Sequence, residues 1–188
     1  VTINKLLPAA VALMALGAAP GALAEDRRGV TRARWLMGTV CEITALGPRA
    51  PEGVEAAFAE IDRLDRVLSI YKDNSELSRV NREALDGPVR VSEDLWLLLL
   101  RSAGAWRLSG GAFDPAAGSP GRFDRVRLDA RTRSVRFEAP LRLDPGGIGK
   151  GYALDAAARS LHRAGVHSAL LNFGGQLLAL DAPPGRTA

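Results

Sequence analysis

The chain has 188 residues, of which 47% are apolar, 24% charged and 5% aromatic, a composition typical of a globular domain that excludes disorder throughout. One cysteine and two histidines exclude an intramolecular disulfide scaffold, a multi-cysteine zinc site and a histidine-rich metal site. The net charge of +4, from 25 basic and 21 acidic residues, is by itself too balanced to indicate nucleic-acid binding.

The first segment has the pattern of an export signal. Lys5 supplies a positive charge, an apolar run covers residues 6–19, and small residues precede an abrupt change to charged residues at 25–28. This pattern predicts a secretory signal peptide over residues 1–24 and a mature domain over residues 25–188, located in the periplasm or otherwise exported. The alternative is an uncleaved anchor that keeps the protein at the inner membrane, for which the run is short and interrupted by proline and glycine.

The first part of the mature chain combines one alternating and two helical patterns. Residues 34–46 alternate and predict one strand, in which Cys41 is expected to be a buried small hydrophobe. Apolar residues at helical spacing predict an amphipathic helix over residues 52–69. After a loop, a short helix is expected over residues 75–83, with Ser75 as its cap.

The middle of the chain predicts a short strand at residues 89–91 and then a helix capped by Ser92. This helix carries six consecutive apolar residues at 95–100, so we expect it to be apolar on all sides and the most buried element. Gly110 and Gly111 end it.

The last part predicts mostly strands. These are a hairpin of residues 125–129 and 134–138, a short strand at 141–143, a helix at 151–164, and strands at 167–173 and 176–180. The apolar inner face of the hairpin would consist of Val126, Leu128, Val135 and Phe137. Because helices mix with strands joined by short turns, the order predicts an α+β layered domain rather than a doubly wound parallel sheet.

The most informative segment for chemistry is the glycine-rich stretch at residues 143–152. A strand is expected to enter this turn and a helix to leave it, so unpaired N–H groups at the helix start would face an anion. Lys150 lies in or beside the first helical turn, where a cation opposes the helix dipole unless a phosphate is bound there. The alternative is that Lys150 points at solvent. The spacing matches neither a P-loop nor a dinucleotide-binding fingerprint.

Three other candidates carry weaker signals. Pro115 forces Asp114 toward an extended backbone, which would display its carboxylate and the Phe113 ring on a rigid turn. The alternative is that Asp114 caps the next turn. Tyr71 and Met37, each taken alone, are more typical of packing than of ligand contact.

Taken together, these segments resemble the ApbE family, the FAD:protein FMN transferases. The resemblance runs from Trp35 to about Leu180 in five ordered blocks, at residues 37–39, 69–81, 111–115, 143–155 and 171–175. It implies a T-fold-like domain with a mostly antiparallel sheet and packed helices. It also implies an exported enzyme that uses FAD and Mg²⁺, transfers FMN to a Thr or Ser hydroxyl of an acceptor protein, and releases AMP.

The resemblance also implies roles for individual residues. By carry-over, the FAD site would be lined by Met37, Tyr71, Ala112, Phe113, Asp114, Asp144 and Lys150. Lys150 would face the phosphates, and the Gly147 carbonyl would be one Mg²⁺ ligand, since magnesium prefers oxygen.

The chain departs from the family pattern at its C-terminal side. Family members continue to a His block and an Asp-Ala-x-x-Thr block that completes the Mg²⁺ site, whereas this sequence stops at Ala188. Three interpretations follow: a fragment of a transferase, a short flavin-binding relative without transfer activity, or a chain whose site a second chain completes. In each we expect exposed strand edges and apolar surface.

A hypothesis of another class rests on arginines near the predicted hairpin. They are Arg125, Arg127, Arg131, Arg133, Arg136 and Arg142, mostly opposite its apolar face. They could bind an anionic partner, whereas the simpler interpretation is a solvated outer face. Aromatic residues for base stacking are not interleaved with them, so we expect no nucleic acid.

Overall fold

The computed structural model describes residues 29–180. Its strands are β1 (Gly29–Leu36), β2 (Thr39–Leu46), β3 (Val89–Arg90), β4 (Val126–Asp129), β5 (Ser134–Phe137), β6 (Ser168–Phe173) and β7 (Gln176–Leu180). Its α-helices are α1 (Ala50–Leu68), α2 (Glu76–Glu83), α3 (Glu93–Leu108) and α4 (Gly149–Arg163), and a 3-10 turn covers Phe123–Arg125.

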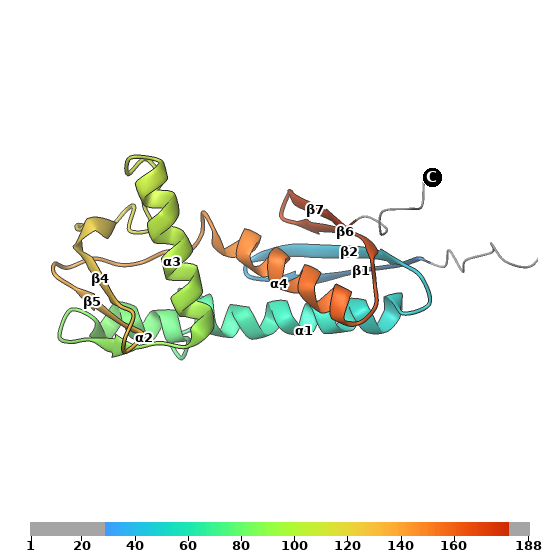
Figure 1. Ribbon diagram of the computed structural model, residues 1–188, viewed down its shortest axis with the longest axis horizontal. Coiled ribbons are helices and arrows are strands. Elements are labelled where there is room, and N and C mark those ends of the chain that lie inside the picture. Colours follow the sequence, from blue (N-terminus) through green and yellow to red (C-terminus); the bar gives the residue numbers. More distant parts are fainter. Residues whose placement is uncertain (1–28, 181–188) are drawn as a thin grey trace, which may run out of the picture.

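The described strands form two antiparallel sheets. The larger has the order β1-β2-β6-β7 and the smaller the order β3-β5-β4. Figure 1 shows the larger sheet with α1 and α4 at one end of an elongated molecule, and the smaller sheet with α2 and α3 at the other. The α+β layered prediction with a mostly antiparallel sheet is therefore confirmed.

The prediction of one strand over residues 34–46 is wrong, because the chain folds back on itself in the middle. β1 and β2 pair antiparallel around Met37 and Gly38, whose φ angles are 47° and 77°. Two successive positive φ angles are those of a type I′ hairpin turn. The alternating pattern hid this turn because a methionine at its first central position is an unusual choice.

The predicted strand at residues 141–143 is also absent. Pro140 precedes this segment and Pro145 follows it, and a proline cannot donate to a sheet ladder. The backbone of Leu143 bonds instead to the side-chain amide of Asn81. The segment is extended, but its partner is a side chain rather than a strand.

The helix with the long apolar run is not the most buried element. In α3, Leu97 and Leu100 are 41% and 44% exposed, whereas α1 and α4 each have more buried residues. A run of six apolar residues surrounds a helix, but only one side of α3 meets the core. Helical periodicity with a polar opposite face identified the deeply packed helices better than the apolar run did.

Most other predicted elements are confirmed. The Ser75 hydroxyl caps α2 by accepting a hydrogen bond from the N–H of Ser78. On the predicted apolar face of the hairpin β4–β5, Val126, Val135 and Phe137 are buried and Leu128 is partly buried. Cys41 is fully buried in β2, and this burial raises the pKa of its thiol to about 11. The thiol is therefore protonated at neutral pH, as expected of a cysteine that serves as a small hydrophobe.

The larger sheet buries one face and exposes the other. Exposed on the face turned away from α1 are Trp35, Val40, Leu46, Leu170 and Leu177. Within residues 29–180, β7 has one paired neighbour and lies at the sheet edge. These features match the expected exposed edge and apolar surface.

The predicted signal peptide lies outside the described residues, so its cleavage and the export of the protein stay predictions. Over residues 29–180, none of the helices has the length and apolar character needed to cross a bilayer.

Gly53 lies where α1 packs against the end of α4 and the turn that follows it. A Cβ added to Gly53 would lie 2.5 Å from Cγ2 of Val166, a buried and stiff β-branched side chain. We therefore expect Gly53→Ala to destabilise the fold by about 1–3 kcal/mol in urea unfolding, because overpacking outweighs the better helix propensity of alanine. Gly104 of α3 is the matched control, since nothing lies within 4 Å of its added Cβ. Gly104→Ala should stabilise by about 0.5–1 kcal/mol, and equal gains from both substitutions would contradict this view of the interface.

Candidate functional site

A cleft of about 690 Å³ lies where the β1–β2 turn, the C-terminal end of α1 and the glycine-rich turn meet. Four of the predicted site residues line it: Met37, Tyr71, Asp144 and Lys150. Its volume is within the range of small-molecule sites. Three segments that are far apart in the sequence thus converge on one cavity.

The glycine-rich turn wraps tightly into α4. Asp144 Oδ1 accepts a hydrogen bond of 2.8 Å from the N–H of Gly146, and the Pro145 carbonyl accepts from the N–H groups of Ile148 and Gly149. Helix α4 then begins at Gly149. Within residues 29–180, no group accepts a hydrogen bond from the N–H of Lys150 or Gly151, so both remain available to an anion.

The two lysines of the cleft differ in their electrostatic environment. Lys72 Nζ lies 2.5 Å from Asp65 Oδ2, so its charge is paired within the protein. Lys150 forms no ion pair with any described residue, although it is the second residue of α4, where a cation opposes the helix dipole. A bound anion would supply the missing counter-charge, which makes this end of the cleft a candidate phosphate site.

Met37 and Tyr71 also line the cleft. The Met37 Cε atom lies 3.6 Å from the position that a Cβ on Gly149 would occupy, so the β1–β2 turn contacts the start of α4. Tyr71 is 87% exposed, and its N–H donates to the Ser69 hydroxyl at 3.1 Å. Its ring is therefore presented at the mouth of the cleft rather than packed in the core.

Known proteins of one family match most of this chain. The model of the ApbE family matches residues 37–187. The chain belongs to the ApbE family. This confirms the family resemblance that the five sequence blocks indicate.

Two named relatives of this ApbE-family chain carry the same description. The FAD:protein FMN transferase of Treponema pallidum (strain Nichols) is 31% identical over 188 residues, a match covering 81% of this chain and 52% of the relative. That of Klebsiella pneumoniae (strain 342) is 28% identical over 149 residues, covering 65% and 47%. The chain spans about half the length of these curated relatives.

Solved ApbE structures share the fold at lower sequence identity. The ApbE protein of Thermotoga maritima superimposes with a TM-score of 0.76 at 21% identity, covering 85% of this chain and 61% of that one. The flavin transferase ApbE of Vibrio cholerae gives a TM-score of 0.75 at 18% identity, covering 81% and 59%. At these identities the likeness establishes the fold alone.

The predicted site residues 112–114 do not line the cleft, and of the three only Phe113 contacts the glycine-rich turn. The Phe113 Cε2 atom lies 2.9 Å from where a Cβ on Gly147 would be, so this ring covers the glycine. Asp114 Oδ1 accepts hydrogen bonds from the N–H groups of Ala116 and Phe123, which is the turn-capping alternative. Ala112 is exposed beside Phe113.

Several residues of the site were not singled out from the sequence. Asp62, Asp65 and Lys72 line the cleft, and Asn81 holds the segment that enters the turn. Lys72 and Asn81 lie within a block that carries the family resemblance, but neither shows its partner by spacing alone. Their partners are 7 and 62 residues away along the chain.

The Gly147 carbonyl is the Mg²⁺ ligand that the family resemblance implies for this turn. That carbonyl accepts no hydrogen bond from a described residue, and Gly147 borders a second groove of about 330 Å³. The carboxylate lining this groove, Asp155, is paired with Arg101 at 2.9 Å. Residues 29–180 contain no cluster of three acidic, histidine or cysteine ligands. One free carbonyl does not make a magnesium site, so these residues alone do not fit the ion.

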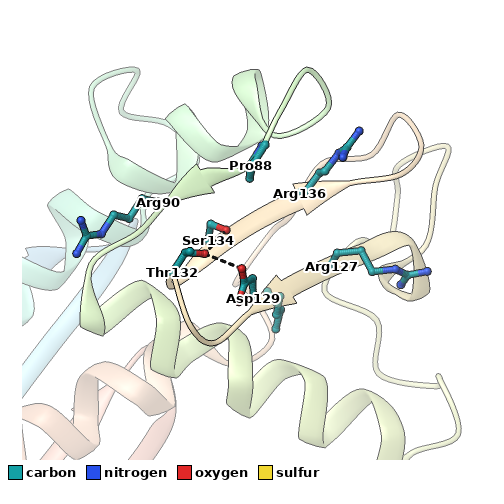
Figure 2. Close-up of a pocket in the computed structure, with 8 residues that line it drawn as sticks. Pro88, Arg90, Arg127, Asp129, Thr132, Ser134 and Arg136 are labelled. Carbon is teal, nitrogen blue, oxygen red and sulfur yellow. Dashed lines mark hydrogen bonds between the residues drawn. The ribbon is translucent and has the colours of Figure 1, made fainter.

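The arginine-rich hairpin forms a shallow hollow of about 420 Å³ on the outer face of the smaller sheet. Figure 2 shows the side chains of Arg90, Arg127 and Arg136 extending in different directions, while Thr132 bonds to Asp129 at its centre. Arg127 lies opposite Arg136 in the strand register and pairs with Glu138 at 2.5 Å. Diverging guanidinium groups favour the solvated-face interpretation over a convergent anion site.

Asn81 offers a test of how the turn is held. Its amide donates to the Leu143 carbonyl at 2.9 Å and accepts from the Leu143 N–H at 2.8 Å. Asn81→Ala leaves both backbone groups of a buried residue without their partner, so we expect a loss of about 1–3 kcal/mol in urea unfolding. Faster amide exchange at residues 143–147 should accompany it. Asn74→Ala is the control, because Asn74 is an exposed loop residue whose side chain bonds to no described group. Equal effects of the two substitutions would contradict the positioning role.

Proposed function

We propose that this chain binds FAD in the cleft between the β1–β2 turn and the glycine-rich turn, and that it serves FMN transfer to protein. The single observation that carries this proposal is the Lys150 ammonium beside two N–H groups at the start of α4, none of them with a partner among residues 29–180. An anionic pyrophosphate satisfies both. The names of the relatives, FAD:protein FMN transferase, supply the identity of the nucleotide.

The reaction that the family resemblance implies can be written with its atoms balanced. A Thr or Ser hydroxyl of the acceptor protein attacks the FMN-side phosphorus of FAD. The bond from that phosphorus to the bridging oxygen breaks, AMP leaves with this oxygen, and the hydroxyl proton passes to solvent. In this proposal Lys150 and the α4 N–H groups hold the pyrophosphate, and Tyr71 and Met37 lie beside the nucleotide.

A requirement for Mg²⁺ belongs to the same proposal. When bound, the ion would offset charge on the phosphate oxygens. Residues 29–180 contribute only the Gly147 carbonyl toward it, so the other ligands would come from phosphate oxygens, water or further polypeptide. The proposed reaction steps above involve only the hydroxyl, FAD and residues of this chain. We also propose an exported location for the domain, from the signal-like segment at residues 1–24.

A second candidate function is flavin binding without transfer. The observation that favours it is the incomplete set of metal ligands in the described residues, beside a cleft that is otherwise formed. The two candidates share the FAD site and differ in whether AMP is released.

The FAD site is tested with Lys150→Ala. We expect FAD affinity, measured by titration calorimetry, to fall about 10- to 100-fold, because one charge-assisted contact to the pyrophosphate is lost. Lys150→Arg should retain most of the affinity. Arg107→Ala is the matched control, since it removes one positive charge from an exposed position outside the cleft. Unchanged affinity in Lys150→Ala would refute this placement of the phosphates.

Transfer is tested by incubating the chain with FAD, Mg²⁺ and an acceptor protein of a flavin transferase. Transfer predicts a fluorescent flavin band on the acceptor in a denaturing gel, together with AMP at a one-to-one ratio. FAD binding with neither product establishes the flavin-binding alternative, and the absence of FAD binding rejects both.

A further inference from the structure

The two histidines of the chain meet at the end of α4, away from the cleft. The Nδ1 atoms of His162 and His167 lie 3.4 Å apart, and their ring centroids are separated by 5.6 Å. Both residues are exposed. Lys150, at the other end of the same helix, is 12 residues from His162, which corresponds to about 18 Å along the axis. The histidine pair is therefore separate from the proposed FAD site.

The local backbone brings the two rings together. α4 ends at Arg163, and Gly165 adopts a φ of 83° that reverses the chain toward β6. The Gly165 N–H donates to the His162 carbonyl and the Val166 N–H to the Leu161 carbonyl, each at 2.9 Å, the bonds of a Schellman turn. Because Val166 is buried in the core, this turn is anchored. The pairing of the rings thus rests on a backbone that is ordered before any ligand arrives.

The separation of the two nitrogens suits one metal ion. Two nitrogens bound to a tetrahedral ion at about 2.0–2.1 Å lie about 3.3–3.4 Å from each other. Neutral imidazole is a preferred ligand of Zn²⁺, Ni²⁺ and Cu²⁺. His162 also lies in the last turn of α4, where the helix dipole favours a cation. The adjacent Arg163 guanidinium opposes a cation, and it is hydrogen-bonded to the Ser160 hydroxyl at 3.0 Å.

We propose that His162 and His167 form a surface site for a divalent transition-metal ion of the imidazole-preferring class. Both Nδ1 atoms bind the ion, and water completes the coordination. If one Nδ1 carries a hydrogen, that hydrogen moves to the Nε2 of the same ring when the ion binds, so both imidazoles bind as neutral ligands. This proposal is independent of FAD binding, because it uses no residue of the cleft.

The test is a calorimetric titration of the chain with ZnCl₂ and, separately, NiCl₂ in a weakly coordinating buffer. We expect one ion per chain for the wild type. His162→Ala and His167→Ala should each weaken binding by about tenfold or more. Loss of a residue that only orients a ligand already costs about that much, and here the ligand itself is removed. The double variant retains Cys41, every carboxylate and the terminal amine, so it measures the binding of all other groups and should show none at this site. Circular dichroism confirms that each variant is folded.

Nuclear magnetic resonance of the two imidazole rings provides a second readout. Zn²⁺ should shift the Nδ1 signals of both histidines together and leave the signals of the FAD cleft unchanged. Absence of binding at millimolar Zn²⁺ would show a hydrogen-bonded pair only and overturn the proposal. Binding of equal affinity in the double variant would overturn it as well.

Discussion

The structure around the cleft depends on how little space surrounds the glycine-rich turn. Phe113 closes over Gly147, Met37 and Pro145 lie against Gly149, and the Gln176 amide nitrogen lies 2.8 Å from where a Cβ on Gly151 would be. An added Cβ at Gly147 or Gly151 would lie less than 3.0 Å from Phe113 or Gln176, whereas at Gly149 its neighbours would be at ordinary van der Waals distance. Because these contacts come from separate segments, the turn holds the β1–β2 hairpin, the 112–115 segment and the β6–β7 hairpin close to the start of α4.

The charged side chains of the cleft lie beside this closely packed turn. The cleft holds two lysines, and Asp65 neutralises Lys72. Lys150 has no ion-pair partner among residues 29–180 and lies at a helix N-terminus, where a cation opposes the helix dipole. A helix N-terminus that also carries a positive side chain is suited to bind an anion. The outer face of the smaller sheet has three arginines, whereas the cleft has two lysines. The guanidinium groups of these arginines diverge, however, and that of Arg127 is already paired with Glu138.

This ApbE-family chain matches only part of the length of its relatives. It spans about half the length of its curated relatives and 59–61% of the two solved chains described above. The cleft proposed to bind FAD lies within the part shared with the relatives, whereas Gly147 borders a separate groove in which Asp155 is already paired. The glycine-rich turn thus borders both the cleft and this groove. The exposed outer face of the larger sheet lies near this groove, since Leu177 belongs to both.

The sequence by itself determined the helices with clear polar and apolar sides, the Ser75 cap, the burial of Cys41 and the hairpin β4–β5. In each, the controlling interactions lie within a few residues, or the periodicity of one element identifies its buried face. The five ordered blocks also identified the family. Sequence periodicity failed at residues 34–46, because Met37 adopts a left-handed backbone that local preference disfavours. It failed at residues 141–143, because the partner of Leu143 is the side chain of Asn81. Only the tertiary structure showed that Lys72 is paired while Lys150 has no ion-pair partner among residues 29–180. It alone showed that Phe113 covers Gly147, that Asp114 caps its own turn, and that His162 meets His167. These facts depend on contacts between separate elements and on one backbone reversal, and neither leaves a periodic signal in the sequence.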